Sequence, residues 1–319
     1  MLVYAVRRLL VAIPIILLST MVTFWAVSIS NDPLGALATC TTCGEGARDR
    51  IIELYELDKS IPERYVGWLG DAVTGDLGVA TSQGERPVSD IFWDRFGNTL
   101  RLAVPAFLVI AVVALVLSVY SALRQYTAGD YLVTGFSYFG LAMPTFFFGL
   151  LLQQIFGIWL PDWTGWKPFY VTGMRTDTWL EFLSSVTLPV ITLTLVLVAG
   201  ESRFGRAAML EIKNADYIRT ARAKGLRERT VVFKHMLRNA MIPIVTVWAL
   251  DASALLGGSV VTETIFSWPG LGRMLLDGIF GQDLDMTMAV VTALALLAVV
   301  FNLLADLLYG VLDPRIRHD

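Results

Sequence analysis

Charged residues are scarce in this chain of 319 residues. Asp, Glu, Lys and Arg together make up 17%, against about 25% in a typical soluble domain, whereas 55% of the residues are hydrophobic. The hydrophobic residues stand in long blocks rather than in helical stripes, so they belong in a bilayer and not in a large soluble core. Basic residues concentrate in only one loop, which argues against nucleic-acid binding.

Residues that carry catalytic chemistry are also few. The two histidines, His235 and His318, fall at the ends of hydrophobic blocks, and those blocks contain no recognisable nucleophile–base pair or cluster of metal ligands. A phosphate-binding Gly-x-x-x-x-Gly-Lys-Ser/Thr loop is missing, since no Gly is followed by Lys. The sequence therefore predicts a chain that is not an enzyme, binds no metal or cofactor and does not bind ATP in the usual way.

Cysteine occurs only twice, as Cys40 and Cys43 in a Cys-x-x-Cys pair. The pair falls in a segment that we place outside the membrane, where an oxidising compartment favours a local disulfide. Two free thiols are the alternative. A lone Cys-x-x-Cys without further ligands gives little support to redox chemistry or metal binding.

Six hydrophobic blocks are each long enough, at about 20 residues, to cross a bilayer. They are approximately Leu9–Ile29, Leu100–Ala122, Leu132–Leu160, Leu183–Gly200, Ala240–Thr262 and Met286–Tyr309. The third block is overlong and contains Pro144, so we expect a kinked or tilted span. The first block follows Arg7 and Arg8 as a signal peptide would, but it is about twice as long as a signal peptide's apolar core. We therefore expect an uncleaved span.

Lys and Arg decide the orientation, because they are retained on the cytoplasmic side of a span. Among the short loops, the side that holds both termini and the loop 201–238 carries a clear excess. The sequence thus predicts an all-α polytopic membrane protein with six transmembrane helices and cytoplasmic N- and C-termini. Residues 1–30 form the first helix, residues 31–98 an extracytoplasmic cap, and residues 99–319 a core with the other five helices.

The segment 31–98 is too long to be a simple connection. Residues Arg48–Asp58 place apolar side chains at helical spacing, and Tyr65 and Trp68 continue that spacing up to Gly75. We therefore expect a small helical cap on the outer surface.

The cytoplasmic loop 201–238 is strongly basic. Its ten basic residues are Arg203, Arg206, Lys213, Arg219, Arg222, Lys224, Arg227, Arg229, Lys234 and Arg238. A short helix is predicted to begin at Asp216 and to stop at Gly225. A second helix should begin near Glu228 and continue into the fifth span.

One side of the short helix carries, at three- and four-residue spacing, Tyr217, Thr220, Ala221 and Lys224. The small Ala221 and Ala223 would let the helix approach a partner groove closely, and Arg219 and Arg222 would meet acidic residues of that partner. The alternative is an amphipathic loop that rests on anionic lipid headgroups.

This loop resembles the coupling motif of ABC importer permeases, in particular the B-type permease subunit of dipeptide, oligopeptide and nickel importers. The matching residues are Asp216-Tyr217-Ile218-Arg219-Thr220-Ala221-Arg222-Ala223-Lys224-Gly225-Leu226 and His235-Met-Leu-Arg-Asn-Ala-Met-Ile-Pro243. One departure is Thr220, where the family's helix often carries an acidic residue. The two cysteines are no signature of that family.

Four other places agree with the same family, in the same order along nearly the whole chain. They are Tyr4-Ala-Val-Arg-Arg-Leu-Leu with Asn31-Asp-Pro33; Leu57-Asp58-Lys59-Ser-Ile-Pro62 with Tyr65 and Gly75-Asp-Leu-Gly78; Gly257-Gly258 through Glu263-Thr-Ile-Phe-Ser-Trp-Pro-Gly-Leu-Gly272; and Asp306-Leu-Leu-Tyr with Leu312-Asp-Pro-Arg-Ile-Arg317.

The resemblance implies a type I ABC importer permease fold, a core of permease type over residues 99–319 and a location in a bacterial or archaeal plasma membrane. It implies a second, homologous permease subunit as a heterodimeric partner, two ATPase subunits or one fused ATPase, and an extracytoplasmic substrate-binding protein. ATP and Mg would be bound by the ATPases, and residues 216–226 would couple them to transport. Di- or oligopeptides are the expected substrates, with nickel or another small solute as the alternative.

Four residues of the fifth span and its outer end are candidates for the pathway or its gate. Asp251 falls near mid-span, where a carboxylate is costly unless it is paired or faces water, so it either contacts a substrate amine or pairs with another helix. Ser259 lies beside two glycines and suggests close packing. Glu263 and Trp268 either form a gate that contacts the binding protein, or Trp268 is only an interfacial anchor.

A self-powered secondary transporter is the alternative from a different class. Such a protein needs a chain of buried ionisable residues or paired broken helices in repeated halves. Asp251 alone gives that alternative little support.

Overall fold

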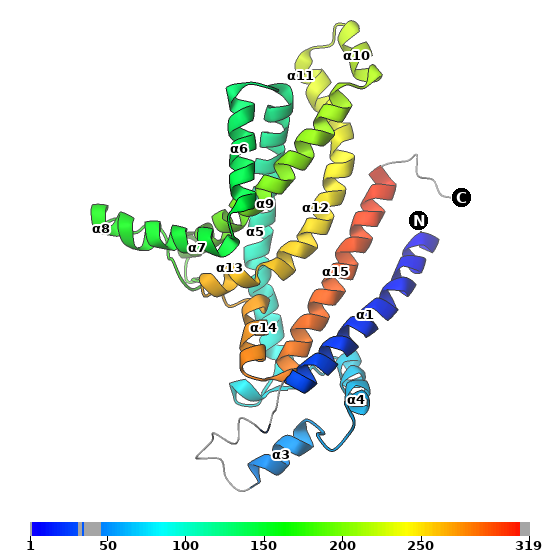
Figure 1. The fold of residues 1–319 in the computed structure, drawn as a ribbon, viewed down its shortest axis with the longest axis vertical. Coiled ribbons are helices and arrows are strands. Elements are labelled where there is room, and N and C mark those ends of the chain that lie inside the picture. Colours follow the sequence, from blue (N-terminus) through cyan, green and yellow to red (C-terminus); the bar gives the residue numbers. More distant parts are fainter. Residues whose placement is uncertain (1, 31–33, 35–45, 313–319) are drawn as a thin grey trace. The chain divides into compact units, whose positions relative to one another are not determined.

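The computed structural model describes residues 2–30, 34 and 46–312 (Figure 1). Cys40 and Cys43 lie outside the described residues, so their disulfide stays a prediction. The chain divides into two compact units: the first comprises Met1–Ala5, Leu100–Trp268 and Val300–Asp319, and the second comprises Val6–Thr99 and Pro269–Val299.

Within the described residues, five helices are long and apolar enough to cross a membrane. They are Leu10–Ser30 of α1 (Leu2–Ser30), α5 (Val88–Leu123), α9 (Trp179–Lys213), the run Glu228–Ile265, and Leu284–Leu308 of α15 (Leu284–Leu312). The run 228–265 consists of α11 (Glu228–Thr230), a π-helical segment (Val231–Leu237), α12 (Arg238–Gly258) and α13 (Val260–Ile265). Six spans result when the bent pair Ala128–Ala142 and Thr145–Thr164 counts as one, which confirms the predicted number.

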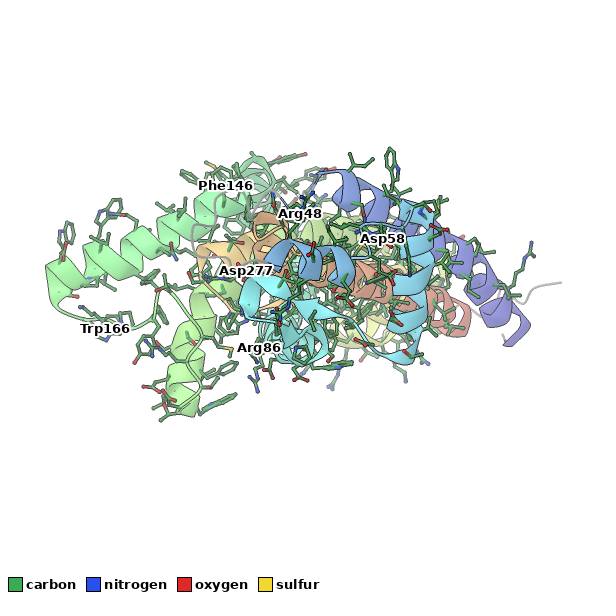
Figure 2. All side chains as sticks on the ribbon, turned by 90° about the horizontal axis from the view of Figure 1, so that it is seen from below. Arg48, Asp58, Arg86, Phe146, Trp166 and Asp277 are labelled. Carbon is green, nitrogen blue, oxygen red and sulfur yellow. The ribbon has the colours of Figure 1, made fainter. Side chains whose placement is uncertain are left out.

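The third span is bent far more sharply than a kinked helix. Helix α6 (Ala128–Ala142) and the run Thr145–Thr164 meet at an angle of 101°. That run consists of α7 (Thr145–Gln154), a π-helical segment (Ile155–Trp159) and α8 (Leu160–Thr164). The break falls at Met143 and Pro144, because Pro144 has no N–H to continue the ladder and forces an extended conformation, ψ 132°, on Met143. Aromatic side chains are exposed on this run and just past its end, among them Phe146 and Trp166 (Figure 2).

The fourth span is longer than its apolar block. We expected it to end at Gly200 and a loop to begin at Glu201, but α9 continues to Lys213. The prediction was wrong because residues after Gly200 still place small or apolar side chains at helical spacing: Gly205, Ala208 and Met209 are buried. Within the first unit α9 packs against α6, α7 and α12.

The second unit contains the predicted helical cap, with α3 (Ala47–Leu54) and α4 (Ile61–Thr74). Helix α4 begins after Ser60, whose N–H and Oγ both donate to the Glu63 carboxylate at 2.9 and 2.7 Å. It ends at Gly75, which adopts the left-handed conformation at φ 92°. The Tyr65 hydroxyl ties this helix to α1 through Thr20, at 2.9 Å.

A small hairpin follows α4 and was not expected in an all-α chain. Strands β1 (Val79–Ala80) and β2 (Arg86–Pro87) pair antiparallel around a 3₁₀ turn (Thr81–Gln83). Asp283, which is fully buried, holds that turn: its Oδ2 accepts from the N–H and Oγ of Ser82 at 3.1 and 2.9 Å. Its Oδ1 accepts from the N–H of Met286 in the first turn of α15. Helix α14 (Leu271–Phe280) precedes this residue.

Candidate functional site

Helix α10 (Asp216–Ala223) occupies the predicted position between α9 and the run 228–265, at one end of the first unit (Figure 1). Its cap residue is Ala215, and Asp216 is its first residue. Gly225 stops the helix as predicted, since its φ of 73° is a conformation that only glycine adopts readily.

The inner side of α10 is fastened to its own chain. Ile218 is fully buried and Ala221 is 7% exposed. They belong to one apolar cluster with Met209 of α9 and with Val231 and Met236 of the π-helical segment. The close approach that we expected the small Ala221 to make with a partner groove is therefore made with the chain's own helices.

The two arginines of α10 also differ in what they contact: one binds its own chain and the other is exposed. Arg222 binds Glu228 of α11 through two hydrogen bonds, Nη2 to Oε1 at 2.8 Å and Nε to Oε2 at 3.2 Å. Arg219 is held only by a 3.6 Å contact with Asp216, and their side chains are 72% and 96% exposed. Arg222 thus pairs with Glu228 of its own chain instead of with the acidic residue of a partner protein that we predicted. An outward surface remains, with exposed side chains at Tyr217, Arg219, Thr220, Ala223, Lys224 and Leu226.

An ion-pair network lies at the same end of the bundle. Nη2 and Nε of Arg206 donate to the two oxygens of Asp130 at 2.9 and 3.1 Å. The Asp130 carboxylate also accepts from the Ser121 hydroxyl and from the N–H of Tyr126. In addition, Lys213 donates to the carbonyl of Ala122 at 2.9 Å. Two of the ten basic residues expected in a solvated loop therefore join α9 to α5 and α6.

Asp251, on α12, lies beside Glu201 on α9, within hydrogen-bonding reach. Glu201 is 7% exposed. Its Oε2 and the Nε1 of Trp248 are both buried without a hydrogen-bond partner of ordinary geometry. All three side chains line a cavity of about 10 Å³, close to the least that one water needs. Two carboxylates this close repel unless a shared proton or a cation lies between them.

Glu201 was missed by the sequence reasoning, which assigned it to the cytoplasmic loop. It lies 50 positions before Asp251 and follows the apolar block of the fourth span. The available signal was the continued helical spacing of small residues after Gly200. Glu201 lies on another helix, where the pairing alternative for Asp251 requires a partner; that alternative and the substrate contact both stay predictions.

The outer candidates, Ser259, Glu263 and Trp268, are all fully buried. The Ser259 Oγ donates to Oε1 of Glu263 at 3.0 Å, across the junction of α12 and α13. The Trp268 ring packs against Phe182 of α9 with centroids 6.4 Å apart. Burial of the ring argues against an interfacial anchor, since an anchor requires an accessible ring. The gate assignment of Glu263 and Trp268 stays a prediction.

The features above define a class of protein. Several apolar helices cross the membrane, carboxyl groups lie between two of them, and a short helix is anchored at one end of the same bundle. Among the described residues no group of three or more His, Cys, Asp or Glu side chains could hold a metal ion. These features are those of an all-α, multi-pass membrane protein.

Comparison with known sequences gives the family. The chain belongs to the binding-protein-dependent transport system inner membrane components, whose family description matches residues 114–318. The N-terminal part described for the membrane components of such systems matches residues 1–103.

Three relatives are similar along nearly their whole length. The oligopeptide transport system permease protein AppB of Bacillus subtilis (strain 168) is 39% identical over 99% of both chains. The glutathione transport system permease protein GsiC of Pectobacterium atrosepticum is 36% identical over 100% of both chains. The dipeptide transport system permease protein DppB of Escherichia coli (strain K12) is 33% identical over 100% of this chain and 99% of that one.

Proposed function

We propose that this chain is one of two permease subunits of an ATP-driven importer of di- or oligopeptides, and that α10 couples it to separate ATPase subunits. The relatives support a peptide substrate over nickel, since their names specify an oligopeptide, a dipeptide and glutathione. Heterodimerisation with a homologous permease, an extracytoplasmic binding protein, and the location of ATP hydrolysis on other chains belong to the same proposal.

The observation that carries the coupling proposal is the division of α10 into an anchored side and an outward side. Ile218 and Ala221 bury it against α9 and the π-helical segment, and Arg222 ties it to α11. A force applied to the outward side therefore reaches α9 and α12 together. These two helices carry Glu201 and Asp251, so a displacement of one helix against the other changes the contact between the carboxyl groups.

Charge reversal on the outward side tests this coupling. Arg219→Glu leaves the anchored side untouched and changes only an exposed contact, so the thermal midpoint of the isolated subunit should stay nearly unchanged. We expect peptide uptake and peptide-stimulated ATPase activity to fall at least about tenfold, which corresponds to losing roughly 1.4 kcal/mol of interaction with the ATPase.

The matched control is Arg48→Glu, a charge reversal at an exposed position of the second unit. It should leave uptake at the wild-type rate. Normal uptake by Arg219→Glu, or equal losses in both variants, would contradict the assignment of α10.

Purification from the native membrane tests whether separate ATPase subunits supply the energy for transport. ATPase subunits should co-purify with this chain, and vesicles that contain this chain alone should not accumulate peptide. Uptake by those vesicles driven by an ion gradient would instead support the secondary-transporter alternative.

We also propose that Asp251 lines the transport pathway, with its interaction with Glu201 opened when a substrate ammonium takes the place of the shared proton or cation. Asp251→Asn should slow uptake of free peptides more than uptake of N-acetylated peptides, because only the free peptides carry the ammonium. An unchanged rate and substrate profile would leave Asp251 with the helix-pairing role alone.

A further inference from the structure

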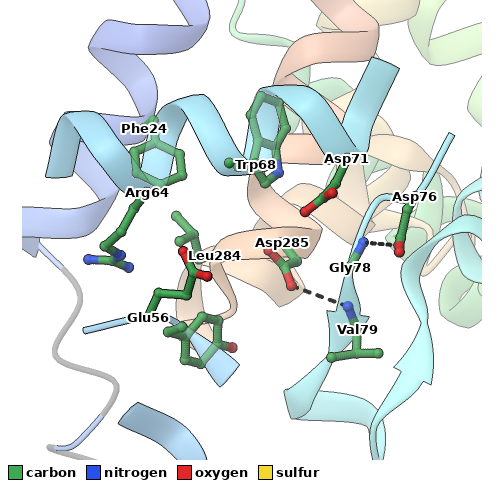
Figure 3. A pocket seen from close by; sticks show the side chains of 12 residues that line it. Phe24, Glu56, Arg64, Trp68, Asp71, Asp76, Gly78, Val79, Leu284 and Asp285 are labelled. Carbon is green, nitrogen blue, oxygen red and sulfur yellow. Dashed lines mark hydrogen bonds between the residues drawn. The ribbon is translucent and has the colours of Figure 1, made fainter. Parts of the chain in front are cut away.

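The second unit contains a pocket of about 320 Å³ between α1, α4, the hairpin and the start of α15 (Figure 3). That volume lies within the range of small-molecule sites, which begins at about 300 Å³. Its twelve lining residues are Phe24, Tyr55, Glu56, Arg64, Gly67, Trp68, Asp71, Asp76, Gly78, Val79, Leu284 and Asp285. None of them belongs to α9, α10 or α12, so the pocket is separate from the coupling helix and the carboxyl pair.

One face of α4 supplies most of the chemistry. Arg64, Trp68 and Asp71 stand at positions i, i+4 and i+7, which share one side of an α-helix. In Figure 3 Arg64 and Phe24 lie on one side of the pocket, Asp71 and Asp76 on the other, and Trp68 between them. The wall therefore carries positive charge at one end and negative charge at the other, with an aromatic ring in the middle.

The positive end has donors that the chain does not satisfy. Arg64 is only 9% exposed, and its Nε is buried without a hydrogen-bond partner. The Nε1 of Trp68 is also buried and unpartnered. The nearby carboxylate of Glu56 is engaged by Lys59 in a half-exposed ion pair, with Nζ 2.6 Å from Oε1. Because a buried donor without an acceptor costs about 1–3 kcal/mol, this end is suited to an incoming carboxylate.

Burial lowers the pKa of the Arg64 guanidinium, and the charges of Glu56 and Asp285 act in the opposite direction. Arginine ordinarily has a pKa above about 12, so Arg64 remains a cation at neutral pH. It is available for a charge-assisted hydrogen bond, which is roughly twice as strong as a neutral one.

The opposite end has spare acceptors. Asp76 accepts from the N–H of Gly78 at 2.9 Å through Oδ1 only, and Asp285 accepts from the N–H of Val79 at 3.2 Å through Oδ2 only. Each of these carboxylates keeps a second oxygen, and the side chain of Asp71 is exposed. An ammonium group, with three donors, matches this set.

We propose that this pocket binds a small zwitterion, an α-amino acid or a dipeptide. Its ammonium group lies at Asp71, Asp76 and Asp285, and its carboxylate lies at Arg64 and Trp68. Seven residues of α-helix separate Arg64 from Asp71 by about 10.5 Å. An extended dipeptide of about 7 Å with a hydrogen bond of about 3 Å at each end needs about 13 Å, so the side chains of Arg64 and Asp71 have to reach about 2.5 Å beyond the rise of the helix. Each further residue adds about 3.5 Å, which excludes longer peptides.

Binding is measured on the whole transporter in lipid nanodiscs without nucleotide or binding protein, so the result is independent of the proposed transport function. Radiolabelled L-lysine and lysyl-glycine are the probes, with lysyl-tetraglycine as the long comparison. We expect saturable binding of the two short probes. Because carboxylates outnumber the guanidinium, lysine should bind more tightly than glutamate. N-Acetyl-lysine and lysinamide, which each lack one end charge, should each bind about tenfold more weakly, as expected for one charge-assisted hydrogen bond.

Two substitutions place the binding in this pocket rather than in the transport pathway. Asp71→Asn should remove the preference for lysine over N-acetyl-lysine, and Arg64→Met should remove the preference over lysinamide. Arg64→Lys keeps the charge and should restore that second preference. Asp58→Asn, which changes an exposed carboxylate outside the pocket, should bind like the wild type.

The proposal would be overturned if both capped compounds bound with the affinity of lysine. It would also be overturned if no saturable binding occurred below roughly 10 mM, which corresponds to a binding free energy weaker than about 3 kcal/mol. Identical behaviour of Asp71→Asn and Asp58→Asn would also overturn it. If lysine alone binds, the ligand is a free amino acid; if lysyl-glycine also binds, dipeptides occupy the pocket as well.

Discussion

Removal of one partner from the ion pair between Asp130 and Arg206 should cost the first unit about 3 kcal/mol of stability. Asp130 is 3% exposed and accepts from Arg206, from a hydroxyl and from a backbone N–H. Removal of one partner from a buried ion pair typically costs about 3–5 kcal/mol. Because the Arg206 side chain is 28% exposed, solvent screens part of that charge, and we expect about 3 kcal/mol for Arg206→Met.

A double-mutant cycle separates this interaction from other effects of the substitutions. The variants are Arg206→Met, Asp130→Ala and their combination, each unfolded in mixed micelles with increasing fractions of sodium dodecyl sulfate. The double variant should be far more stable than the sum of the single losses predicts, with a coupling energy of about 2 kcal/mol.

The pair Asp216–Arg219 is the matched control within the same unit. Its charged atoms lie 3.6 Å apart, but both side chains are largely exposed, so its coupling energy should stay below about 1 kcal/mol. Equal coupling energies for the two pairs would refute the reasoning that burial makes the Asp130–Arg206 pair strong.

Three further outcomes are expected. Gly78→Ala should lower the stability by at least about 1–2 kcal/mol, because φ is 79° there and a Cβ would overlap a carboxylate; Gly70→Ala, in open space within α4, should not lower it. Glu201→Gln supplies a permanent donor to Asp251 and should raise the stability at neutral pH by about 1 kcal/mol; a lower thermal midpoint than the wild type would count against the pairing. Hydrogen bonds from the Ser60 hydroxyl, and then from its N–H, lower the pKa of Glu63. The start of α4 should therefore be protected from hydrogen exchange at pH values above the ordinary carboxyl pKa. That protection should be lost as the pH falls through the lowered pKa of Glu63 in the folded state. Glu63→Gln should abolish this pH dependence.

The sequence predicted the features that depend on local patterns. The number of spans, the helical cap, the short helix at 216–225 and its stop at Gly225 follow from hydrophobic block length, helical spacing and the conformational freedom of glycine. The break in the third span was anticipated at Pro144, but its angle of 101° was not, because proline fixes where a helix breaks and surrounding packing fixes the new direction.

The features that the sequence did not reveal depend on residues far apart in the chain. Glu201 and Arg206 looked like loop residues because both are ionised in water, and only neighbours on α12 and α6 give them partners. The pocket around Arg64 likewise needs α1 and the start of α15, which stand about 40 positions before and 220 positions after it. Tertiary packing decides which residues from such distant parts of the chain meet, and local patterns in a single sequence do not reveal it.

If α10 couples to an ATPase as proposed, its division into an anchored side and an outward side has a consequence for cells that run several related transporters at once. The residues that fasten it inward are committed to the architecture of their own subunit, and only the outward set remains to vary with the motor that it meets. Exchange of a few outward side chains can therefore redirect a permease to a different motor while its inner packing stays intact. Under the proposed coupling, recognition and folding would draw on separate positions of a helix only eight residues long, so one could diverge without the other.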